Sequence, residues 1–224
     1  MNNDFYIGCS GYYYPQWKNS FYPSSLKPVK WLEFYSTVFN AVELNGTFYR
    51  IPKLKDLERY NSVTPDDFIF SVKVNKYITH VLRLKESKSS IEEFKDLIKK
   101  GLAGKFHYLL FQFPSSFHYS ESNMDLIIDS IGKGSENIIE FRHISWWNKI
   151  VFERLQNRFI KTTDNFYLRL HGTPLLFKSS YSENQLQHFH SHMPANCNSY
   201  AVFFNNTYYD AAYKNALELK KLIQ

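Results

Sequence analysis

Residues 29–45 read VKWLEFYSTVFNAVELN, and this stretch contains the repeating unit that decides the fold. Apolar side chains recur with a helical period over residues 29–39, which predicts an amphipathic helix. Residues 41–45 follow as a short, mostly apolar run that ends on a polar residue, which predicts a buried strand. A helix followed at once by such a strand is typical of parallel α/β structure.

The same alternation continues along the chain. Strands are predicted at residues 5–9, 41–45, 68–73, 107–112, 138–142, 166–171 and 200–205, and helices at residues 29–39, 54–63, 91–100, 124–131, 149–158, 183–192 and 211–223. Strand–helix units without a linker predict an α/β fold, a TIM-barrel-like parallel (β/α) barrel. A chain of 224 residues with 44% hydrophobic content can bury a sizeable core, so we expect a single domain over residues 1–224.

Local signals indicate where two of the helices begin and end. Ser90 with Glu93, and Ser182 with Gln185, have the spacing of a capping box, in which each side chain satisfies a free backbone N–H of the other residue. Gly101 is expected to close the helix that starts at Ser90, in a left-handed conformation.

The charge and the cysteine content limit the classes of protein to which this chain can belong. The net charge of +6 and the pI near 9.1 favour anionic partners and leave nucleic-acid binding open. Cys9 and Cys197 are expected to be unbridged, because a chain of this length needs no disulfide framework. No signal-peptide pattern or membrane-spanning apolar run is visible, so a cytoplasmic location without membrane contact is predicted. The oligomeric state is not predicted.

Polar side chains gather at the ends of the predicted strands. Residues two apart share one face of a strand. The pairs that share a face are Glu43 with Asn45, Ser71 with Lys73, Leu110 with Gln112, Glu140 with Arg142, and Arg169 with His171. Their neighbours are apolar and suit packing against helices, so these pairs are expected to face the inside of the barrel near its C-terminal rim, where barrel active sites are built.

Two interpretations of this polar set stay open. The charged members can pair with one another and plug the barrel, or they can line a ligand site. Two glutamates against three permanent cations leave a positive surplus, which favours an anionic ligand bearing phosphate or carboxylate, with Arg142 and Arg169 offering paired donors. Glu43 and Glu140 are alternatively an acid–base pair.

Motifs in nearly the whole chain resemble those of one known family. They are Ile7-Gly8-Cys9-Ser10-Gly11-Tyr12 followed by Trp17 and Phe21-Tyr22-Pro23, Val42-Glu43-Leu44-Asn45 with Thr47-Phe48-Tyr49-Arg50, Phe70-Ser71-Val72-Lys73 with Ile78-Thr79-His80, Leu110-Phe111-Gln112-Phe113-Pro114, Glu140-Phe141-Arg142-His143 with Ser145-Trp146, Arg169-Leu170-His171-Gly172, and Phe203-Phe204-Asn205-Asn206. In this order they resemble the DUF72 family, also called the YecE-like family.

The resemblance implies a TIM-barrel-like fold with a polar pocket at its C-terminal end, and it implies no reaction, so whether the protein is an enzyme stays open and its cofactors are unknown. The catalytic candidates are Glu43, Glu140 and His171. The ligand-binding candidates are Ser10, Tyr14, Trp17, Asn45, Tyr49, Arg50, Lys73, His80, Gln112, Arg142, Trp146, Arg169 and Asn205. Tyr14 and Trp17 belong to an aromatic cluster that is either a hydrophobic lid or a stacking wall for a sugar or base.

One segment departs from the family pattern. Members of the family usually place another short strand and an acidic loop before the strand that here is predicted at residues 166–171. Residues 159–165 are too few for a strand, a loop and a crossover, so the sixth strand unit is expected to be shortened or missing. Asp164 is the one acidic residue in this segment.

Three histidines invite a metal interpretation. His188 and His192 are four residues apart and share a helix face, whereas His190 points elsewhere. A closed structural site normally needs four ligands, so no metal site is predicted. Two functions remain open: binding or conversion of a small anionic molecule, and non-catalytic binding of nucleic acid or another ligand through a basic surface and an aromatic rim.

Overall fold

The computed structural model describes residues 4–132, 134–151 and 165–223. Within these residues, strands and helices alternate, and the strand pairs within each compact part of the chain are parallel. The chain divides into two compact units. The first comprises Met1–Leu44, Ser62–Ile69 and Thr163–Gln224, and the second comprises Asn45–Asn61 and Phe70–Thr162. The expectation of a single domain stays a prediction.

The first unit contains a parallel sheet in the order β2–β1–β7–β6. Its strands are β1 (Asp4–Cys9), β2 (Ala41–Leu44), β6 (Asn165–Leu170) and β7 (Ser199–Phe204). Each coincides with a predicted strand to within a residue or two. Strand β7 is buried after its first residue and β1 is buried over its last three residues, which explains the apolar runs in their sequences.

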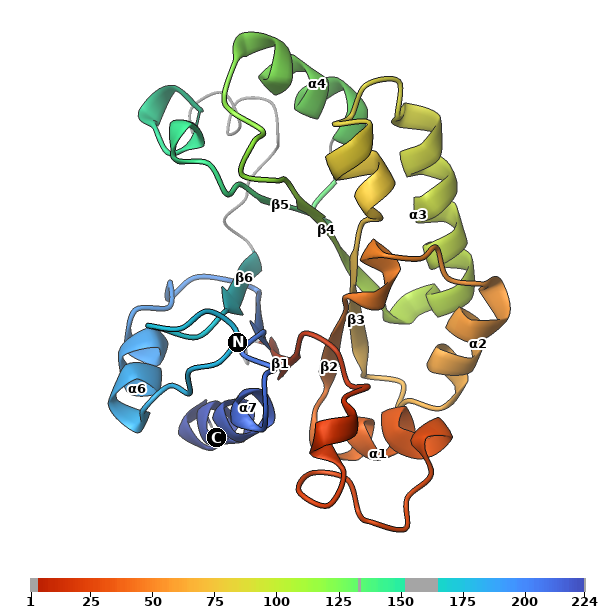
Figure 1. Ribbon diagram of the computed structural model, residues 1–224, viewed down its shortest axis with the longest axis vertical. Coiled ribbons are helices and arrows are strands. Elements are labelled where there is room, and N and C mark those ends of the chain that lie inside the picture. Colours follow the sequence, from red (N-terminus) through yellow and green to blue (C-terminus); the bar gives the residue numbers. More distant parts are fainter. Residues whose placement is uncertain (1–3, 133, 152–164, 224) are drawn as a thin grey trace. The chain divides into compact units, whose positions relative to one another are not determined.

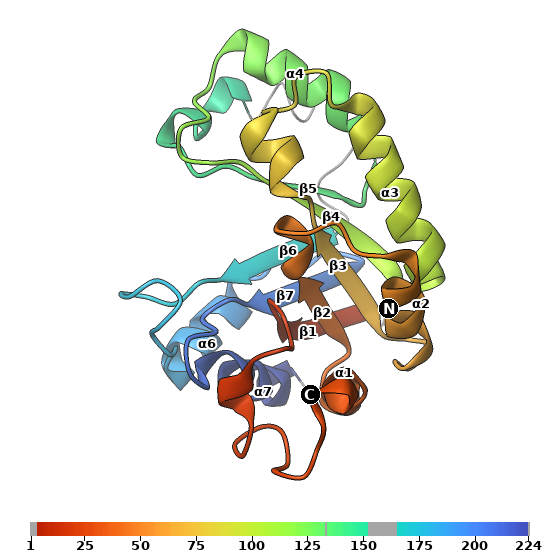
Figure 2. The same cartoon turned by 45° about the vertical axis from the view of Figure 1, so that its right-hand side comes forward.

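Helices cover this sheet and complete the core of the first unit. They are α1 (Trp31–Val38), α6 (Glu183–Ser191) and α7 (Ala211–Ile223), with short 3₁₀ turns at Pro15–Trp17 and Pro28–Lys30. Helix α7 packs against β1 and β7, and α6 packs against α7 (Figure 2). The predicted capping box of α6 is confirmed: Ser182 Oγ accepts from the Gln185 N–H, and the Gln185 side chain accepts from the Ser182 N–H.

Aromatic rings fill the space between the first strand and its helices. The Tyr22 and Trp31 rings stack with centroids 4.6 Å apart, and Trp17 meets Tyr213 of α7 edge-on at 5.3 Å. The Tyr35 hydroxyl accepts from the Cys9 N–H at 2.7 Å and donates to the Ala41 carbonyl at 3.0 Å, which ties α1 to both β1 and β2. Much of the high aromatic content therefore builds this core.

The second unit contains strands β3, β4 and β5 in parallel, with β4 in the middle. Its elements are β3 (Ile69–Lys73), β4 (Phe106–Gln112), β5 (Asn137–Glu140), α2 (Leu54–Ser62), α3 (Lys88–Leu102), α4 (Glu121–Ile131), the π-helical turn Tyr77–Val81, and the 3₁₀ turns Gly46–Phe48, Ala103–Lys105 and Ile144–Trp146. Helix α3 packs on β4 and lies beside α4 (Figure 1). The three strands match the predicted ones.

The predicted ends of helix α3 are wrong. The helix begins at Lys88, and the Ile91 N–H donates to the Ser87 carbonyl at 2.9 Å, so Ser90 lies inside the first turn and does not cap it. Gly101 is helical, and the left-handed residue is Ala103, with φ 48°. A Cβ on Gly101 would stand 2.3 Å from the Leu57 Cβ of α2, so this glycine permits close helix packing.

The predicted defect at the sixth strand position cannot be compared with the structure, because residues 152–164 lie outside the described residues. The same holds for Asp164 and for most of the helix predicted at residues 149–158. None of the helices in the described part of the chain combines the length and apolar character needed to cross a membrane. The cytoplasmic location stays a prediction.

Candidate functional site

A buried carboxylate lies at the centre of the first unit. Glu43 on β2 is 0% exposed, and its two oxygens accept hydrogen bonds from three side chains. Arg169 on β6 donates through Nε at 2.9 and 3.2 Å and through Nη2 at 2.8 Å. The hydroxyls of Ser10 and Tyr167 donate at 2.7 and 2.6 Å. These four residues, Ser10, Glu43, Tyr167 and Arg169, are the Glu43 cluster.

The Glu43 cluster indicates that the sheet of this unit is curved. Strands β2 and β6 are the outer strands of the four. Three strand spacings amount to about 14 Å on a flat sheet. Glu43 and Arg169 nevertheless meet at 2.8 Å, as side chains do on the concave face of a barrel-like sheet. The predicted shared face of these two residues is thereby confirmed.

Glu43 is held in its charged form. Burial by itself raises the pKa of this carboxyl, but the charge of Arg169 and the hydrogen bonds from Arg169, Tyr167 and Ser10 outweigh burial and lower the pKa. A general acid needs a raised pKa. For Glu43 the geometry therefore favours the ion-pair interpretation over acid catalysis. The Arg169 side chain is 5% exposed, so its guanidinium is already committed to Glu43.

Of the two aromatic candidates of the first unit, Trp17 lies in the interior and Tyr14 is half-buried. Trp17 is 0% exposed, and its indole N–H donates to the Tyr209 carbonyl at 2.8 Å. Tyr14 packs on Trp17 with centroids 4.7 Å apart and donates its hydroxyl to the Ser10 carbonyl at 2.5 Å. For Trp17 the structure leaves no ring face for a ligand, which corrects the stacking-wall interpretation in favour of a core residue.

His171 and Asn205 lie just past the ends of the adjacent strands β6 and β7. The Asn205 amide nitrogen is 3.0 Å from His171 Nδ1. Because an amide NH₂ can only donate, this contact assigns Nδ1 as the acceptor and leaves the proton of neutral His171 on Nε2. Nε2 of His171 is therefore a hydrogen-bond donor. The catalytic role of His171 stays a prediction.

In the second unit, a chain of polar contacts joins the ends of three neighbouring strands. Lys73 Nζ donates to Gln112 Oε1 at 2.8 Å, and Gln112 Nε2 donates to Glu140 Oε1 at 2.7 Å. Arg142 Nε lies 3.4 Å from the same Glu140 oxygen. Register explains the contact, because Gln112 and Glu140 are direct partners in the β4–β5 ladder. The predicted shared face of these strand ends is confirmed within this unit.

His80 lies in a positive environment beside this chain. The Lys73 ammonium sits over the Phe48 ring, 4.1 Å from its centroid, and His80 meets the same ring edge-on at 4.9 Å. Burial first, and then the charges of Lys73, Arg142 and Arg83, lower the pKa of His80. We call Lys73, His80, Gln112, Glu140 and Arg142 the strand-end cluster.

The remaining candidates of the second unit divide between surface and core. Tyr49 is 72% exposed, and Arg50 is exposed beside it. Asn45 precedes the turn Gly46–Phe48 that carries Phe48. Trp146 is buried and donates its indole N–H to the Phe117 carbonyl at 2.6 Å, which corrects its expected role as a ligand contact.

Sequence reasoning missed several residues that hold these clusters together. Tyr167 was open to prediction, because it shares the inward face of its strand with Arg169 by the period of two. Phe48 and the Thr47–Lys73 contact had no such signal, since they lie in a turn. Thr47 Oγ1 donates to the Lys73 carbonyl at 2.6 Å, and Asn75 donates to the Thr47 carbonyl at 2.9 Å, which fixes the turn against the end of β3.

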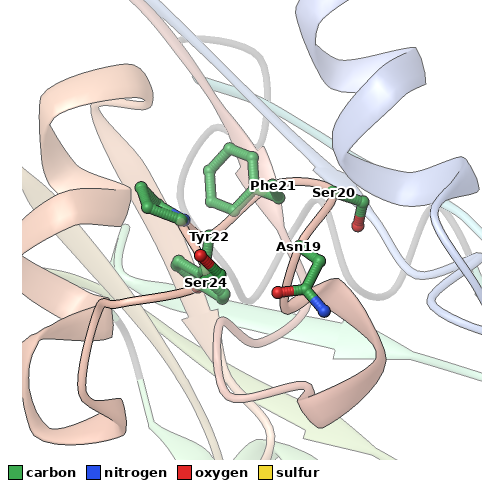
Figure 3. A pocket seen from close by; sticks show the side chains of 6 residues that line it. Asn19, Ser20, Phe21, Tyr22 and Ser24 are labelled. Atoms are coloured by element: carbon green, nitrogen blue, oxygen red, sulfur yellow. The ribbon is translucent and has the colours of Figure 1, made fainter.

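Each cluster lies within one compact unit. The prediction that Lys73, Arg142 and Arg169 line one cavity with Glu43 and Glu140 therefore stays a prediction. A separate hollow of about 430 Å³ is formed by the loop residues 19–24 of the first unit (Figure 3). None of the side chains that line it is charged, so it does not meet the expectation of an anion site.

In the described residues the cysteines are buried, and no metal site of three or more side chains is present. Cys9 and Cys197 are not bridged, as predicted, and both are buried. Burial raises the pKa of the Cys9 thiol far above its usual range, and the Tyr35 hydrogen bond lowers it only in part. Within the described ranges, no group of three or more His, Cys, Asp and Glu side chains is placed to hold a metal ion.

Parallel strands that alternate with helices, with polar clusters at the carboxyl ends of the strands, define an α/β protein of the TIM-barrel-like class. The chain belongs to the DUF72 family, described as a protein family of unknown function, whose model matches residues 6–224. The predicted fold and the resemblance are both confirmed.

Curated relatives share the family but extend beyond the matched stretch. The chain is 30% identical over 158 residues to the UPF0759 protein YunF of Bacillus subtilis, which covers 66% of this chain and 54% of that protein. It is 29% identical over 154 residues to the UPF0759 protein YecE of Escherichia coli K12, which covers 68% of this chain and 54% of that one. The chain thus spans about half the length of these curated relatives.

Solved structures match over nearly the whole chain. A DUF72 family protein from Thermotoga maritima is 31% identical with a TM-score of 0.86, covering 99% of both chains. One from Enterococcus faecalis is 18% identical with a TM-score of 0.77, covering 98% of this chain and 95% of the other, and it supports the fold alone.

Proposed function

We propose that the protein binds a small anionic molecule, bearing a phosphate or carboxylate group, at the strand-end cluster. The observation that carries this proposal is the environment of His80, where the charges of Lys73, Arg142 and Arg83 add to burial in lowering the pKa. Burial disfavours a charge of either sign, but the positive charges of Lys73, Arg142 and Arg83 favour a negative group over a positive one.

The geometry of the cluster supports the same ligand class. Among the described residues, Glu140 is the carboxylate of the contact chain, and Gln112 is hydrogen-bonded to both Glu140 and Lys73. The Arg142 side chain is 41% exposed and its contact to Glu140 is long, at 3.4 Å. Its guanidinium is therefore accessible to form the shorter, paired hydrogen bonds that phosphate and carboxylate groups accept.

Titration calorimetry with inorganic phosphate, and separately with acetate, tests the proposal. Arg142→Gln should weaken binding by about ten- to a hundredfold, since one charged hydrogen bond contributes about 1.5–3 kcal/mol. Lys100→Gln is the matched control. Lys100 lies near the end of α3, just before β4 begins, so it is close to the amino-terminal end of β4, whereas the strand-end cluster lies at the carboxyl ends of the strands.

Two outcomes would contradict the proposal: no heat of binding with either anion, or an equal loss of affinity in the Arg142→Gln and Lys100→Gln proteins.

Nucleic-acid binding, the alternative function, predicts instead tight binding of an oligonucleotide that weakens steeply with salt. Mass spectrometry of the native purified protein identifies any small molecule that is carried through purification.

A further inference from the structure

The C-terminal end of helix α6 carries two histidine rings in contact. His188 and His192 are four residues apart on one helix face, both are exposed, and their ring centroids are 4.0 Å apart with a tilt of 39°. We propose that this pair is an open binding site for a divalent first-row transition metal ion such as Ni²⁺, Cu²⁺ or Zn²⁺. The site belongs to the first unit and is independent of the strand-end cluster.

The hydrogen bonds of His192 leave the lone pair on Nε2, where a metal ion can bind. Nδ1 of His192 lies 2.8 Å from the His188 carbonyl, which can only accept, so Nδ1 carries the proton. Ser191 Oγ donates to the same carbonyl at 3.0 Å and can accept from Nδ1 at 3.1 Å. The lone pair of neutral His192 is therefore on Nε2. Metal-binding histidines commonly donate their other ring N–H to a backbone carbonyl in this way.

The ring separation also suits a shared ion. Two nitrogens that each bind one metal at about 2.1 Å are about 3.0–3.4 Å apart in octahedral or tetrahedral geometry. The ring centroids are 4.0 Å apart, so the two rings are close enough for rotation about their side-chain torsions to direct one nitrogen of each toward a shared ion, with water completing the coordination shell.

Local electrostatics favour a cation at this position. His188 is in the last turn of α6, and His192 is its C-cap residue. The C-terminal end of a helix carries a partial negative charge that stabilises cations. Helix α6 reads ENQLQHFHS and contains no lysine or arginine to repel a metal ion. Imidazole ligands select zinc, copper or nickel over the hard ions Mg²⁺ and Ca²⁺.

The test follows backbone amide signals of the full ¹⁵N-labelled chain by NMR as Ni²⁺ is added. Paramagnetic broadening should centre on residues 186–193, Zn²⁺ should reverse it by competition, and Mg²⁺ should neither cause nor reverse it. His188→Ala and His192→Ala should each weaken Ni²⁺ binding at this helix at least about tenfold, a loss of the size seen when a metal site is impaired.

His190→Ala is the matched control, because His190 is about 200° around the helix from His188 and should leave the broadening unchanged. Circular dichroism confirms that each variant keeps its helices. Broadening that centres elsewhere, that persists in the His188→Ala and His192→Ala proteins, or that disappears equally in the His190→Ala protein would overturn the proposal.

Discussion

Replacing Arg169 by alanine should make the charge of Glu43 destabilise the folded protein instead of stabilising it. In the native protein the Glu43 carboxylate is 0% exposed and takes two Nε contacts and one Nη2 contact from Arg169. Arg169→Ala removes all three contacts and the compensating charge together. Of the contacts that Glu43 makes with described residues, those from the hydroxyls of Ser10 and Tyr167 remain to stabilise a buried negative charge.

The expected loss is about 3–5 kcal/mol in the free energy of unfolding at pH 7, the usual effect of removing one partner of a buried ion pair. The two remaining hydroxyl contacts place the expected value toward the lower end. Urea unfolding followed by circular dichroism measures the change. The double variant Glu43→Gln/Arg169→Met is the control, because replacing both charges should cost much less than replacing one.

The pH dependence gives a second, independent criterion. In the native protein the pKa of Glu43 is lowered from 4.5, so the stabilisation is complete above that value and is lost as pH falls through the folded-state pKa. In Arg169→Ala, burial dominates and raises the pKa of Glu43, so the variant loses stability as pH rises. The difference between the two proteins must therefore shrink from pH 7 to pH 5. A loss below about 1 kcal/mol at pH 7, or one that does not vary with pH, would refute the ion-pair account.

Two further predictions follow from packing. Gly101→Ala should lower the free energy of unfolding, measured with urea, by about 1–3 kcal/mol, because the new Cβ would stand 2.3 Å from that of Leu57. Gly104→Ala is the control, because a Cβ there meets open space and should change stability by less than about 1 kcal/mol. Equal effects of the two substitutions would contradict this prediction. Cys9 and Cys197 should both resist a thiol reagent in the native protein and react once urea unfolds it, and rapid native labelling of Cys9 would show that its burial is wrong.

The sequence predicted the strands well because their signal is local. In β4, residues 109–112 are buried without interruption, and the preceding chain breaks the apolar pattern at Gly104. A short stretch of sequence is therefore enough to predict this strand. The helix ends were harder. Ser90 carries a capping-box pattern, yet the chain before it is already helical from Lys88, and Ser87 is the N-cap residue.

The candidate site was predictable in membership and less so in its pairings. Strand alternation correctly grouped Glu43 with Arg169, and Gln112 with Glu140, because a strand has a fixed period. It could not give distances between strands, so whether Glu43 was an acid, a base or an ion-pair partner stayed open. Trp17 was misassigned because a buried ring and a stacking wall look alike in a sequence, and only packing separates them.

The division of the first unit along the chain also has a consequence during protein synthesis. Strand β1 pairs with β7, and Cys9 stands opposite Phe204, so the first strand to be synthesised pairs with a strand that is synthesised near the end. The second unit ends at Thr162 and is fully synthesised before β6 and β7 exist. At about 5–20 residues per second, the ribosome needs about 10–40 seconds to reach β7 from β1. During that interval β1 can pair with β2, but its other hydrogen-bonding edge lacks the strand that covers it in the folded protein.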